Sequence, residues 1–299
     1  MPTETIDPRY AGLATRPLAE VVAAMWEGQR GAVTSLESQL GAIAAAAGAM
    51  AGRLRSASGR IAYAGAGTSG RIAVQDGVEL VPTFGWDAAR LAYLMAGGPA
   101  ALTGAVEGAE DDEAAGRAAV AERGLGAADV LIALAASGRT PFTCGALEEA
   151  RARGALTIGM ANNPGTRLLA GADHAILADT GAEVIAGSTR MGAGTAQRAA
   201  LTMLSSAAMV ALGRVHAGRM VAMRPTNAKL RTRAAAMVAE LAGVSQSDAE
   251  AALMASGGDV STAVLLAHGV SARKAAELLA RHSGSLAAVL DELANEGTQ

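Results

Sequence analysis

Two short loops combine glycine with hydroxyl side chains, and each lies between an apolar run and a helix-like segment. Residues 65–71 are Gly-Ala-Gly-Thr-Ser-Gly-Arg, and residues 136–141 are Ala-Ser-Gly-Arg-Thr-Pro. A turn of this kind directs backbone N–H groups and the positive end of a helix at an anion, usually a phosphate. Residues 187–190, Gly-Ser-Thr-Arg, supply a third segment rich in hydroxyl groups. Together the loops predict a site for a phosphorylated small molecule.

The first loop also matches the G-x-G-x-x-G pattern of dinucleotide sites. Such a site needs an acidic residue at the end of the next strand, about 20 residues further on, to hold a ribose. The next strand-like run, 91–95, is followed instead by Ala-Gly-Gly. Thr68 and Ser69 place hydroxyl groups at the two variable positions, where a phosphomonoester can use them. A turn that binds no ligand is the alternative for a single motif, but the additional loops favour a phosphosugar.

Two carboxylates are candidates for proton transfer. Glu79 lies at the far end of the helix expected over 71–80, where the helix dipole is negative and the sequence neighbours are apolar. Both effects would raise its pKa and favour a proton donor. Glu110 lies in the acidic run 107–113, which composition alone describes best as a solvated loop entering a helix. Nothing in the spacing shows that the two glutamates meet.

Composition excludes several classes of protein. The net charge of −3 over 299 residues argues against non-specific binding to nucleic acid, which needs a surplus of basic charge. No run is long and apolar enough to span a bilayer, and the first residues do not resemble a signal peptide, so we expect a cytoplasmic protein. The single Cys144 excludes a disulfide within the chain and a cysteine-based metal cluster. The four histidines show no metal-ligand spacing, and we expect no metal.

Apolar runs alternate with helix-like segments in the middle of the chain. The strand candidates are 60–65, 90–95, 129–135, 155–161 and 174–178. Continuous apolar strands separated by helices predict a parallel sheet that is covered on both faces. Helical spacing precedes the strands over 16–56, with Pro17 suited to a first helical turn, and a helix from Thr195 to about Val215 follows them.

The last part of the chain has a different pattern. Residues 227–295 contain only helix-length segments with short Gly or Ser interruptions. The segments 257–259 and 268–271 are typical of helix ends followed by new N-caps. We therefore expect a small helical bundle that packs on the first domain or on a partner.

Taken together, these segments resemble the N-acetylmuramic acid 6-phosphate etherases, enzymes of peptidoglycan recycling with a sugar isomerase (SIS) domain. The matching blocks, in order, are 65–71, 82–85, 105–111, 135–141, 187–191, 194–197 and 226–230. The resemblance implies an α/β fold, in which a three-layer, flavodoxin-like SIS domain with a parallel sheet occupies residues 56–225. N-terminal helices would occupy 1–55, and a small UBA-like all-helical domain would occupy 226–299.

The resemblance also implies a reaction and a substrate, a phosphorylated amino sugar. The family cleaves the D-lactyl ether at C3 of N-acetylmuramic acid 6-phosphate, which gives N-acetylglucosamine 6-phosphate and D-lactate. Its two catalytic glutamates fall on Glu79 and Glu110. In the open-chain sugar the C1 aldehyde acidifies the C2 proton, so a base can remove it while an acid protonates the departing lactate. Water then adds back. Two carboxylates in opposite protonation states suffice, with no metal and no cofactor, and we assign Glu79 as the acid and Glu110 as the base.

By the same resemblance the 6-phosphate is held by the hydroxyl groups and amides of the loops, so that binding far from C3 fixes the reacting carbons. Arg71 and Arg139 either add positive charge there or form structural ion pairs. The family is homodimeric, so we expect a homodimer here. The expected substrate-binding residues are Gly67, Thr68, Ser69, Ser137, Gly138, Arg139, Thr140, Ser188 and Thr189.

Several residues depart from the family pattern, among them Gly77 and Val78, which stand where the family commonly has Ala and Ser. Leu80 and Val81 stand where the family commonly has Cys and Pro, and Gly192 stands where it has Lys. Two alternative functions share the fold: a non-catalytic sugar-phosphate sensor that regulates a sugar kinase, and an aldose–ketose isomerase. The sensors carry two SIS modules in a longer chain. An isomerase needs C2 proton abstraction but no acid at C3.

Overall fold

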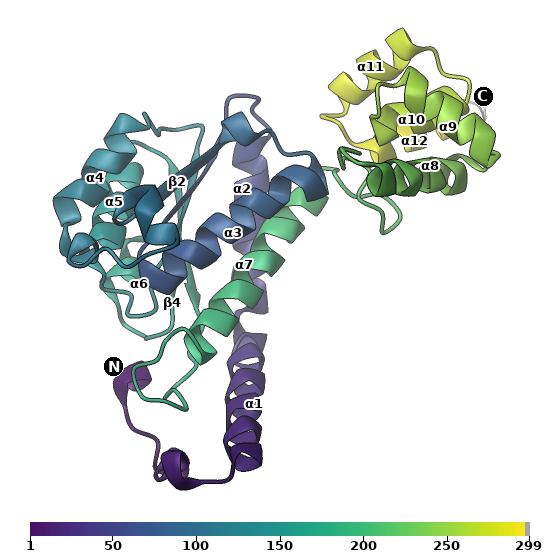
Figure 1. Cartoon of the computed structure of the whole chain (residues 1–299). Helices are drawn as coiled ribbons and strands as arrows, with labels where there is room; N and C mark the ends of the chain where they lie inside the picture. The colour runs from purple at the N-terminus through teal and green to yellow at the C-terminus, as the bar shows by residue number, and fades with distance from the viewer. Residues whose placement is uncertain (297–299) are drawn as a thin grey trace. The chain divides into compact units, whose positions relative to one another are not determined.

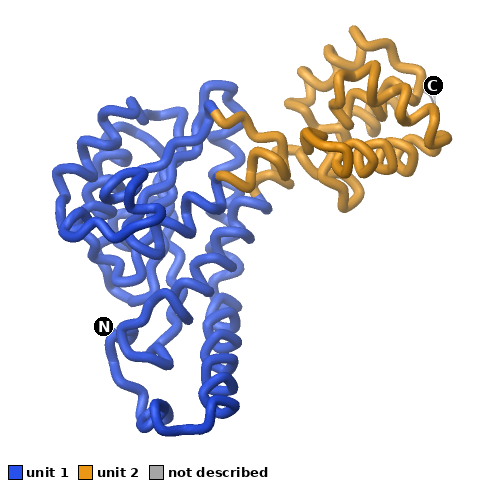
Figure 2. The backbone as a smooth tube through the Cα atoms, viewed as in Figure 1, with its two compact units in different colours: residues 1–77, 89–207 blue, residues 78–88, 208–299 orange. Residues whose placement is uncertain are grey.

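The computed structural model describes residues 1–296 of the chain. The chain forms two compact units (Figure 2). The first contains residues 1–77 and 89–207, and the second contains residues 78–88 and the chain from 208 onward.

Five parallel strands form one sheet in the order β2-β1-β3-β4-β5 (Figure 1). Every residue of the three central strands is buried, which explains their continuous apolar sequence. The predicted strands are confirmed to within one residue at each end. The bounds are β1 Ile61–Gly65, β2 Leu91–Met95, β3 Val130–Leu134, β4 Leu156–Ala161 and β5 His174–Leu177.

Helices flank this sheet on both faces. Those that begin in the first unit are α1 Leu18–Thr34, α2 Leu40–Leu54, α3 Gly67–Phe84, α4 Glu113–Glu122, α5 Pro141–Ala152, α6 Arg167–Gly171 and α7 Gly192–Ala211. Short 3-10 helices are η1 Pro2–Glu4, η2 Pro8–Tyr10, η3 Leu13–Thr15, η4 Glu37–Gln39, η5 Ala88–Arg90, η6 Gly98–Leu102 and η7 Ala109–Asp111.

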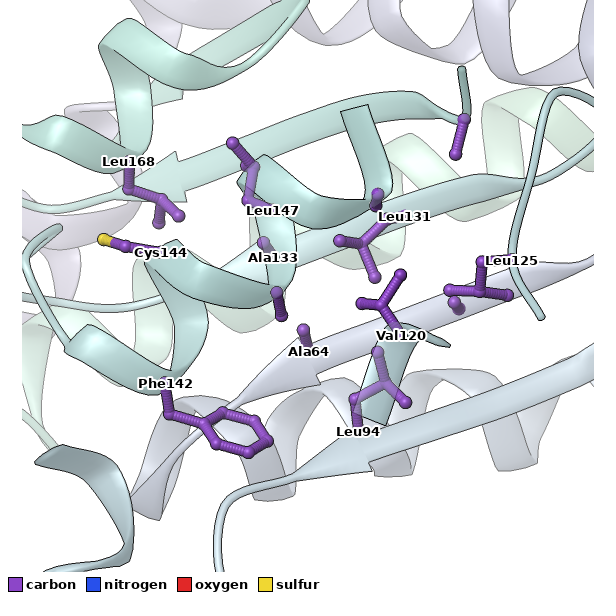
Figure 3. Packing of buried hydrophobic residues seen from close by; sticks show 14 of the residues in the cluster. Ala64, Leu94, Val120, Leu125, Leu131, Ala133, Phe142, Cys144, Leu147 and Leu168 are labelled. Atoms are coloured by element: carbon purple, nitrogen blue, oxygen red, sulfur yellow. The ribbon is translucent and has the colours of Figure 1, made fainter. Parts of the chain in front are cut away.

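Alternate residues of β1 show how the three layers are built, because successive side chains of a strand point to opposite faces. Ala62 and Ala64 join the apolar cluster that α4, α5 and α6 complete (Figure 3). Tyr63, between them, donates a hydrogen bond to Asp76 of α3 on the other face. The predicted three-layer α/β architecture is therefore confirmed.

Glycine lets α4 and α5 approach closely. A Cβ atom on Gly116 would lie 2.0 Å from the carbonyl oxygen of Phe142, and one on Gly145 would lie 2.5 Å from that of Glu113. Neither contact could accommodate a larger residue without moving a backbone. This packing holds the N-terminus of α5, and with it the loop before α5, in a fixed place beside the sheet.

The second unit is helical and has its own apolar core. Its helices beyond residue 227 are α8 Ala228–Ala242, α9 Gln246–Ala255, α10 Val260–Ala267, α11 Ala272–Arg281 and α12 Leu286–Glu296. Asp259 caps α10 by accepting from the backbone N of Thr262 at 2.7 Å, and Ser271 caps α11. Both N-caps occupy the positions predicted from the sequence.

Candidate active site

The strand order reverses direction between β1 and β3. From β1 the chain crosses to β2 on one side, and from β3 it crosses to β4 on the other side. Ligands bind at such a switch point in open α/β sheets, outside the carboxyl ends of the strands. Gly65 and Leu134, the last residues of these strands, pair in register. The loops that follow them, 65–70 and 135–140, therefore emerge side by side.

The first loop begins a helix almost directly on the end of its strand. Gly67, with φ +52°, is already the first residue of α3. A Cβ on Gly70 would lie 2.3 Å from the sulfur of Met95 and 2.8 Å from the carbonyl oxygen of Gly65. Only glycine fits there. The resulting turn carries Thr68, which is half-buried, and Ser69, which is 8% exposed, at the N-terminus of α3.

The second loop forms a small hydroxyl cluster before α5. The Oγ of Ser137 lies 3.3 Å from the Oγ1 of Thr140 and accepts a hydrogen bond of 3.2 Å from the backbone N of Arg139. Gly138 between them has φ +63° and is buried, whereas Arg139 is exposed. The structure thus brings the predicted hydroxyl groups of this loop together at a helix N-terminus, as an anion site requires.

The third segment, 187–190, lies against the first loop. The carbonyl oxygen of Thr189 accepts from the backbone N of Gly194 at 2.8 Å. A Cβ on Gly194 would lie 3.3 Å from that oxygen and 3.5 Å from the methyl carbon of Thr68. Ser188 and Thr189 are both half-buried here.

The N-terminus of α7 has a different occupant, which sequence reasoning missed. Glu183 is 3% exposed, and its two carboxylate oxygens accept from the backbone N of Gly192 and of Ala193, each at 2.8 Å. A carboxylate of the chain itself therefore accepts from the first two backbone N–H groups of α7. The sequence feature that could have indicated this role is Glu183 itself, an acidic residue in an apolar segment nine residues before the start of α7.

The acidic run 107–113 is a loop entering a helix, as predicted. Glu110 is exposed in η7, the 3-10 helix that ends at Asp111. The next residue, Asp112, caps α4 by accepting from the backbone N of Ala115 at 2.8 Å. Glu113 belongs to an ion-pair cluster, where hydrogen bonds from Arg167 and Arg117 lower its pKa to about 2. Within this run Asp112 and Glu113 therefore have structural roles, whereas the exposed Glu110 belongs to neither the cap nor the ion-pair cluster.

Arg71 supports the segment that leads to Glu110. Its guanidinium donates to the carbonyl oxygens of Ala101 at 3.0 Å and Gly104 at 2.7 Å. The contacts of Arg71 support a structural role rather than a contribution of charge to the phosphate site. Its partners are backbone carbonyl oxygens and not the carboxylate of an ion pair.

Glu79 differs from the expectation for a desolvated acid. Its side chain is exposed on α3, and the adjacent Val78 is 52% exposed. The expectation that apolar sequence neighbours bury Glu79 is therefore wrong for the single chain. Leu80, on its other side, is buried at 2%, because successive helix residues point in different directions. Glu79 falls in the second compact unit and Glu110 in the first.

Among residues 1–296 no group of three or more His, Cys, Asp or Glu side chains is placed to hold a metal ion. In the same range, no helix has both the length and the apolar composition needed to cross a membrane.

Comparison with known proteins identifies the family. Residues 106–207 match the SIS domain, and residues 43–151 match the glucokinase regulatory protein N-terminal SIS domain. An N-acetylmuramic acid 6-phosphate etherase of Deinococcus radiodurans is 48% identical over 291 residues, which cover 97% of this chain and 95% of that protein. One of Serratia proteamaculans is 43% identical over 96% of this chain and 97% of its own length. The chain belongs to the N-acetylmuramic acid 6-phosphate etherase family.

A solved structure shares the fold of this etherase-family chain. A protein of Escherichia coli, solved as a complex, covers 67% of this chain and 94% of its own with a TM-score of 0.50 at 16% identity. At that level of identity the similarity concerns the fold alone.

This member of the etherase family also buries a carboxylate that sequence reasoning did not single out. Asp76 of α3 is 4% exposed and accepts hydrogen bonds from the Tyr63 hydroxyl at 2.9 Å and the Ser205 hydroxyl at 3.1 Å. Burial raises the pKa of Asp76 to about 6, although both hydrogen bonds and the Arg198 guanidinium act in the opposite direction. Burial, and then the nearby carboxylate, raises the pKa of Tyr63 as well.

The structure also shows the surroundings of Gly192, which stands where the etherase pattern has Lys. Gly192 is buried at the start of α7, and a Cβ there would lie 3.0 Å from the Glu183 carboxylate. Because glycine has no side chain, the Glu183 carboxylate accepts here from the backbone N–H groups of Gly192 and Ala193.

Proposed function

We propose that this chain cleaves the D-lactyl ether of N-acetylmuramic acid 6-phosphate to N-acetylglucosamine 6-phosphate and D-lactate, by elimination and then hydration. The observation that carries the proposal is the pair of hydroxyl-rich loops at the adjacent ends of β1 and β3, in a chain 48% identical to an etherase over nearly its full length. Peptidoglycan recycling is the process that such a reaction serves.

The 6-phosphate is proposed to bind at the N-termini of α3 and α5. Thr68 and Ser69 supply one set of hydroxyl groups, and Ser137 and Thr140 supply another. Gly67 and Gly138 bring the backbone close, because both have a positive φ. Arg139, Ser188 and Thr189 complete the proposed site. The Glu183 carboxylate, bound at the N-terminus of α7, directs the phosphate away from that third helix terminus, since two like charges do not share one set of amides.

Two glutamates carry the proposed proton transfers. Glu110 removes the C2 proton of the ring-opened sugar, the electron pair forms the C2–C3 double bond, and the C3–O bond to lactate breaks. Glu79 protonates the leaving oxygen and then takes a proton from the water whose oxygen adds at C3, while the protonated Glu110 returns a proton to C2. Glu79 is exposed on the single chain. The desolvation that a carboxylic acid needs therefore comes from the bound sugar or from a second copy of the chain.

The decisive experiment is D-lactate release from N-acetylmuramic acid 6-phosphate in heavy-oxygen water, with a metal chelator present. We expect lactate with ordinary oxygen and a sugar product labelled at C3, because elimination keeps the ether oxygen on lactate. Label in lactate instead of the sugar would contradict elimination–hydration. A folded chain that binds the sugar phosphate but releases no lactate would contradict the etherase proposal and favour the sensor.

The two alternatives have less support. The regulatory-protein model matches only residues 43–151, whereas the etherases match across nearly the whole chain. An isomerase would interconvert an aldose and a ketose phosphate, so turnover of glucosamine 6-phosphate or fructose 6-phosphate is the assay that separates it from an etherase.

A homodimer is proposed from an exposed apolar face on α1. Leu18, Val22 and Trp26 are 80%, 63% and 69% exposed and lie four residues apart, which places them along one face of the helix. Exposed apolar stripes of this kind mark interaction sites. The residue Met254, on α9, is 81% exposed but does not belong to the stripe.

The test is light scattering of the two glutamate variants W26E and M254E beside the unmodified chain. We expect the unmodified chain and M254E to have twice the mass of one chain, and W26E to shift toward a single chain. A dimeric W26E would exclude this face as the main contact.

The cytoplasm is the proposed location, because the substrate carries a phosphate ester whose charge prevents it from crossing a bilayer unaided. Cell fractionation with an antibody to the chain tests this location.

A further inference from the structure

The N-terminal segment buries a single polar residue. Among residues 1–17 only Thr3, which is 1% exposed, is buried. A buried polar side chain in an otherwise exposed segment needs specific hydrogen-bond partners. The sequence pattern of this segment gives no sign of such a role.

The side-chain partner of Thr3 comes from the segment that follows β4. The side-chain amide of Asn163 donates to the Thr3 hydroxyl at 3.1 Å, and its oxygen accepts from the Thr3 backbone N and hydroxyl, each at 3.4 Å. Asn163 follows β4 and is 1% exposed. The same amide group donates to the carbonyl oxygen of Ala136 at 2.8 Å.

A backbone contact connects Thr3 with a second loop. Its carbonyl oxygen accepts from the backbone N of Gly187 at 3.1 Å. The next residue, Glu4, lies beside this exposed glycine: a Cβ on Gly187, which has φ +76°, would lie 3.0 Å from a Glu4 carboxylate oxygen. The N-terminal segment therefore rests directly on the start of the 187–190 loop.

These contacts place Thr3 between two sets of hydroxyl groups. Ala136 directly precedes Ser137, and Gly187 directly precedes Ser188. We infer that Thr3 is a positioning residue that holds the 187–190 loop in register with the 136–140 loop, so that both sets of hydroxyl groups reach one sugar phosphate. The inference rests on the proposed function, since it assigns both loops to the same substrate.

The expected consequence concerns substrate affinity more than chemistry. Thr3 acts through the phosphate-binding loops, so its loss weakens ground-state and transition-state binding alike and raises KM while kcat stays nearly unchanged. T3V keeps the shape of the side chain and removes the hydroxyl. We expect its KM for N-acetylmuramic acid 6-phosphate to rise about tenfold, the effect of losing a buried hydrogen bond and leaving Asn163 short of a partner.

Two further variants make this test specific. T3S restores the hydroxyl and should return KM to within about twofold of the unmodified value, because the hydrogen bond is restored without the methyl group. T5V is the matched control in the same segment, since Thr5 is exposed and its hydroxyl donates to the carbonyl oxygen of Met1 at 3.4 Å rather than to either loop. It should leave KM unchanged. Where T3V does not fold, G187A tests the same link from the loop side and should raise KM, because a side chain at φ +76° strains the backbone whose N–H donates to Thr3.

The outcomes separate this inference from the proposed function. Dissociation constants for N-acetylglucosamine 6-phosphate, measured by calorimetry, do not depend on turnover. If the unmodified chain releases no lactate but T3V still weakens this binding, the etherase proposal fails and the positioning role stands. A T3V variant with unchanged KM and unchanged dissociation constant overturns the positioning role, whether or not its melting temperature falls. A loss of kcat alone overturns it too.

Discussion

Asp76 and Glu79 lie three residues apart on α3, and their surroundings are opposite. Asp76 is 4% exposed and receives two hydroxyl donors, whereas Glu79 is exposed. Sequence neighbours alone assigned desolvation to Glu79, because Val78 and Leu80 beside it are apolar. The structure assigns it to Asp76, because strand β1 and helix α7 pack over that side of α3. A carboxylate in a helix is thus desolvated by what packs on its face rather than by its neighbours in sequence.

The largest expected effect separates the two carboxylates by activity. E79Q should lower D-lactate release by about 10²- to 10⁴-fold, because it removes the proposed proton donor. Its free energy of unfolding should change by less than about 0.5 kcal/mol, since the side chain is exposed. Rate assays paired with urea unfolding check both parts. An active E79Q would transfer the acid role to another group, and C2 proton exchange retained in E79Q would support Glu110 as the base.

A smaller effect appears in the pH dependence of stability at Asp76. Its pKa is about 6 in the folded chain and about 3.8 unfolded, so the folded chain holds this proton more tightly. The associated stability is complete below the unfolded pKa and is lost as pH rises through about 6. From pH 4.5 to 7.5, the unmodified chain should therefore lose about 2 kcal/mol relative to D76N. Urea unfolding of both proteins at the two pH values measures this, and parallel pH profiles would refute it.

The smallest expected effect concerns the donor to Asp76. Y63F removes the hydroxyl that stabilises the charged carboxylate, so the pKa of Asp76 should rise further and unfolding should become easier by about 1–2 kcal/mol at pH 7.5. Y93F is the matched control, because that ring stacks on Tyr63 with centroids 6.0 Å apart and does not provide this hydrogen bond. If Y63F and Y93F show the same pH dependence of the free energy of unfolding, the Tyr63 hydroxyl does not stabilise the charged form of Asp76, and this prediction is wrong.

Much of the fold followed from local patterns. Each predicted strand matches an observed strand closely, because a strand buried on both faces needs a continuous apolar run. The 65–70 loop was also predictable, since a helix that starts on the end of a strand requires glycine where the backbones touch, as at Gly70. The caps at Asp259 and Ser271 depend on a bond to a backbone N three residues away, so they too were encoded locally.

The parts of the site that sequence reasoning missed depend on distant pairs. Thr3 and Asn163 are 160 residues apart in the chain, and Asp76 and Ser205 are 129 apart. No periodicity connects such positions. Glu183 is closer to its partners at the start of α7, but its role depends on the turn that returns its carboxylate to those amides.

The sequence by itself determined the strands, the glycine turns and the hydroxyl-bearing loops, because hydrophobic period and steric freedom act over a few residues. Only the packing shows that Asp76 is desolvated, that Glu183 accepts from the first amides of α7, and that Thr3 contacts Asn163 and Gly187. Each of these depends on segments that meet only when the sheet and its covering helices are packed. Desolvation and hydrogen-bond completion are properties of that packing.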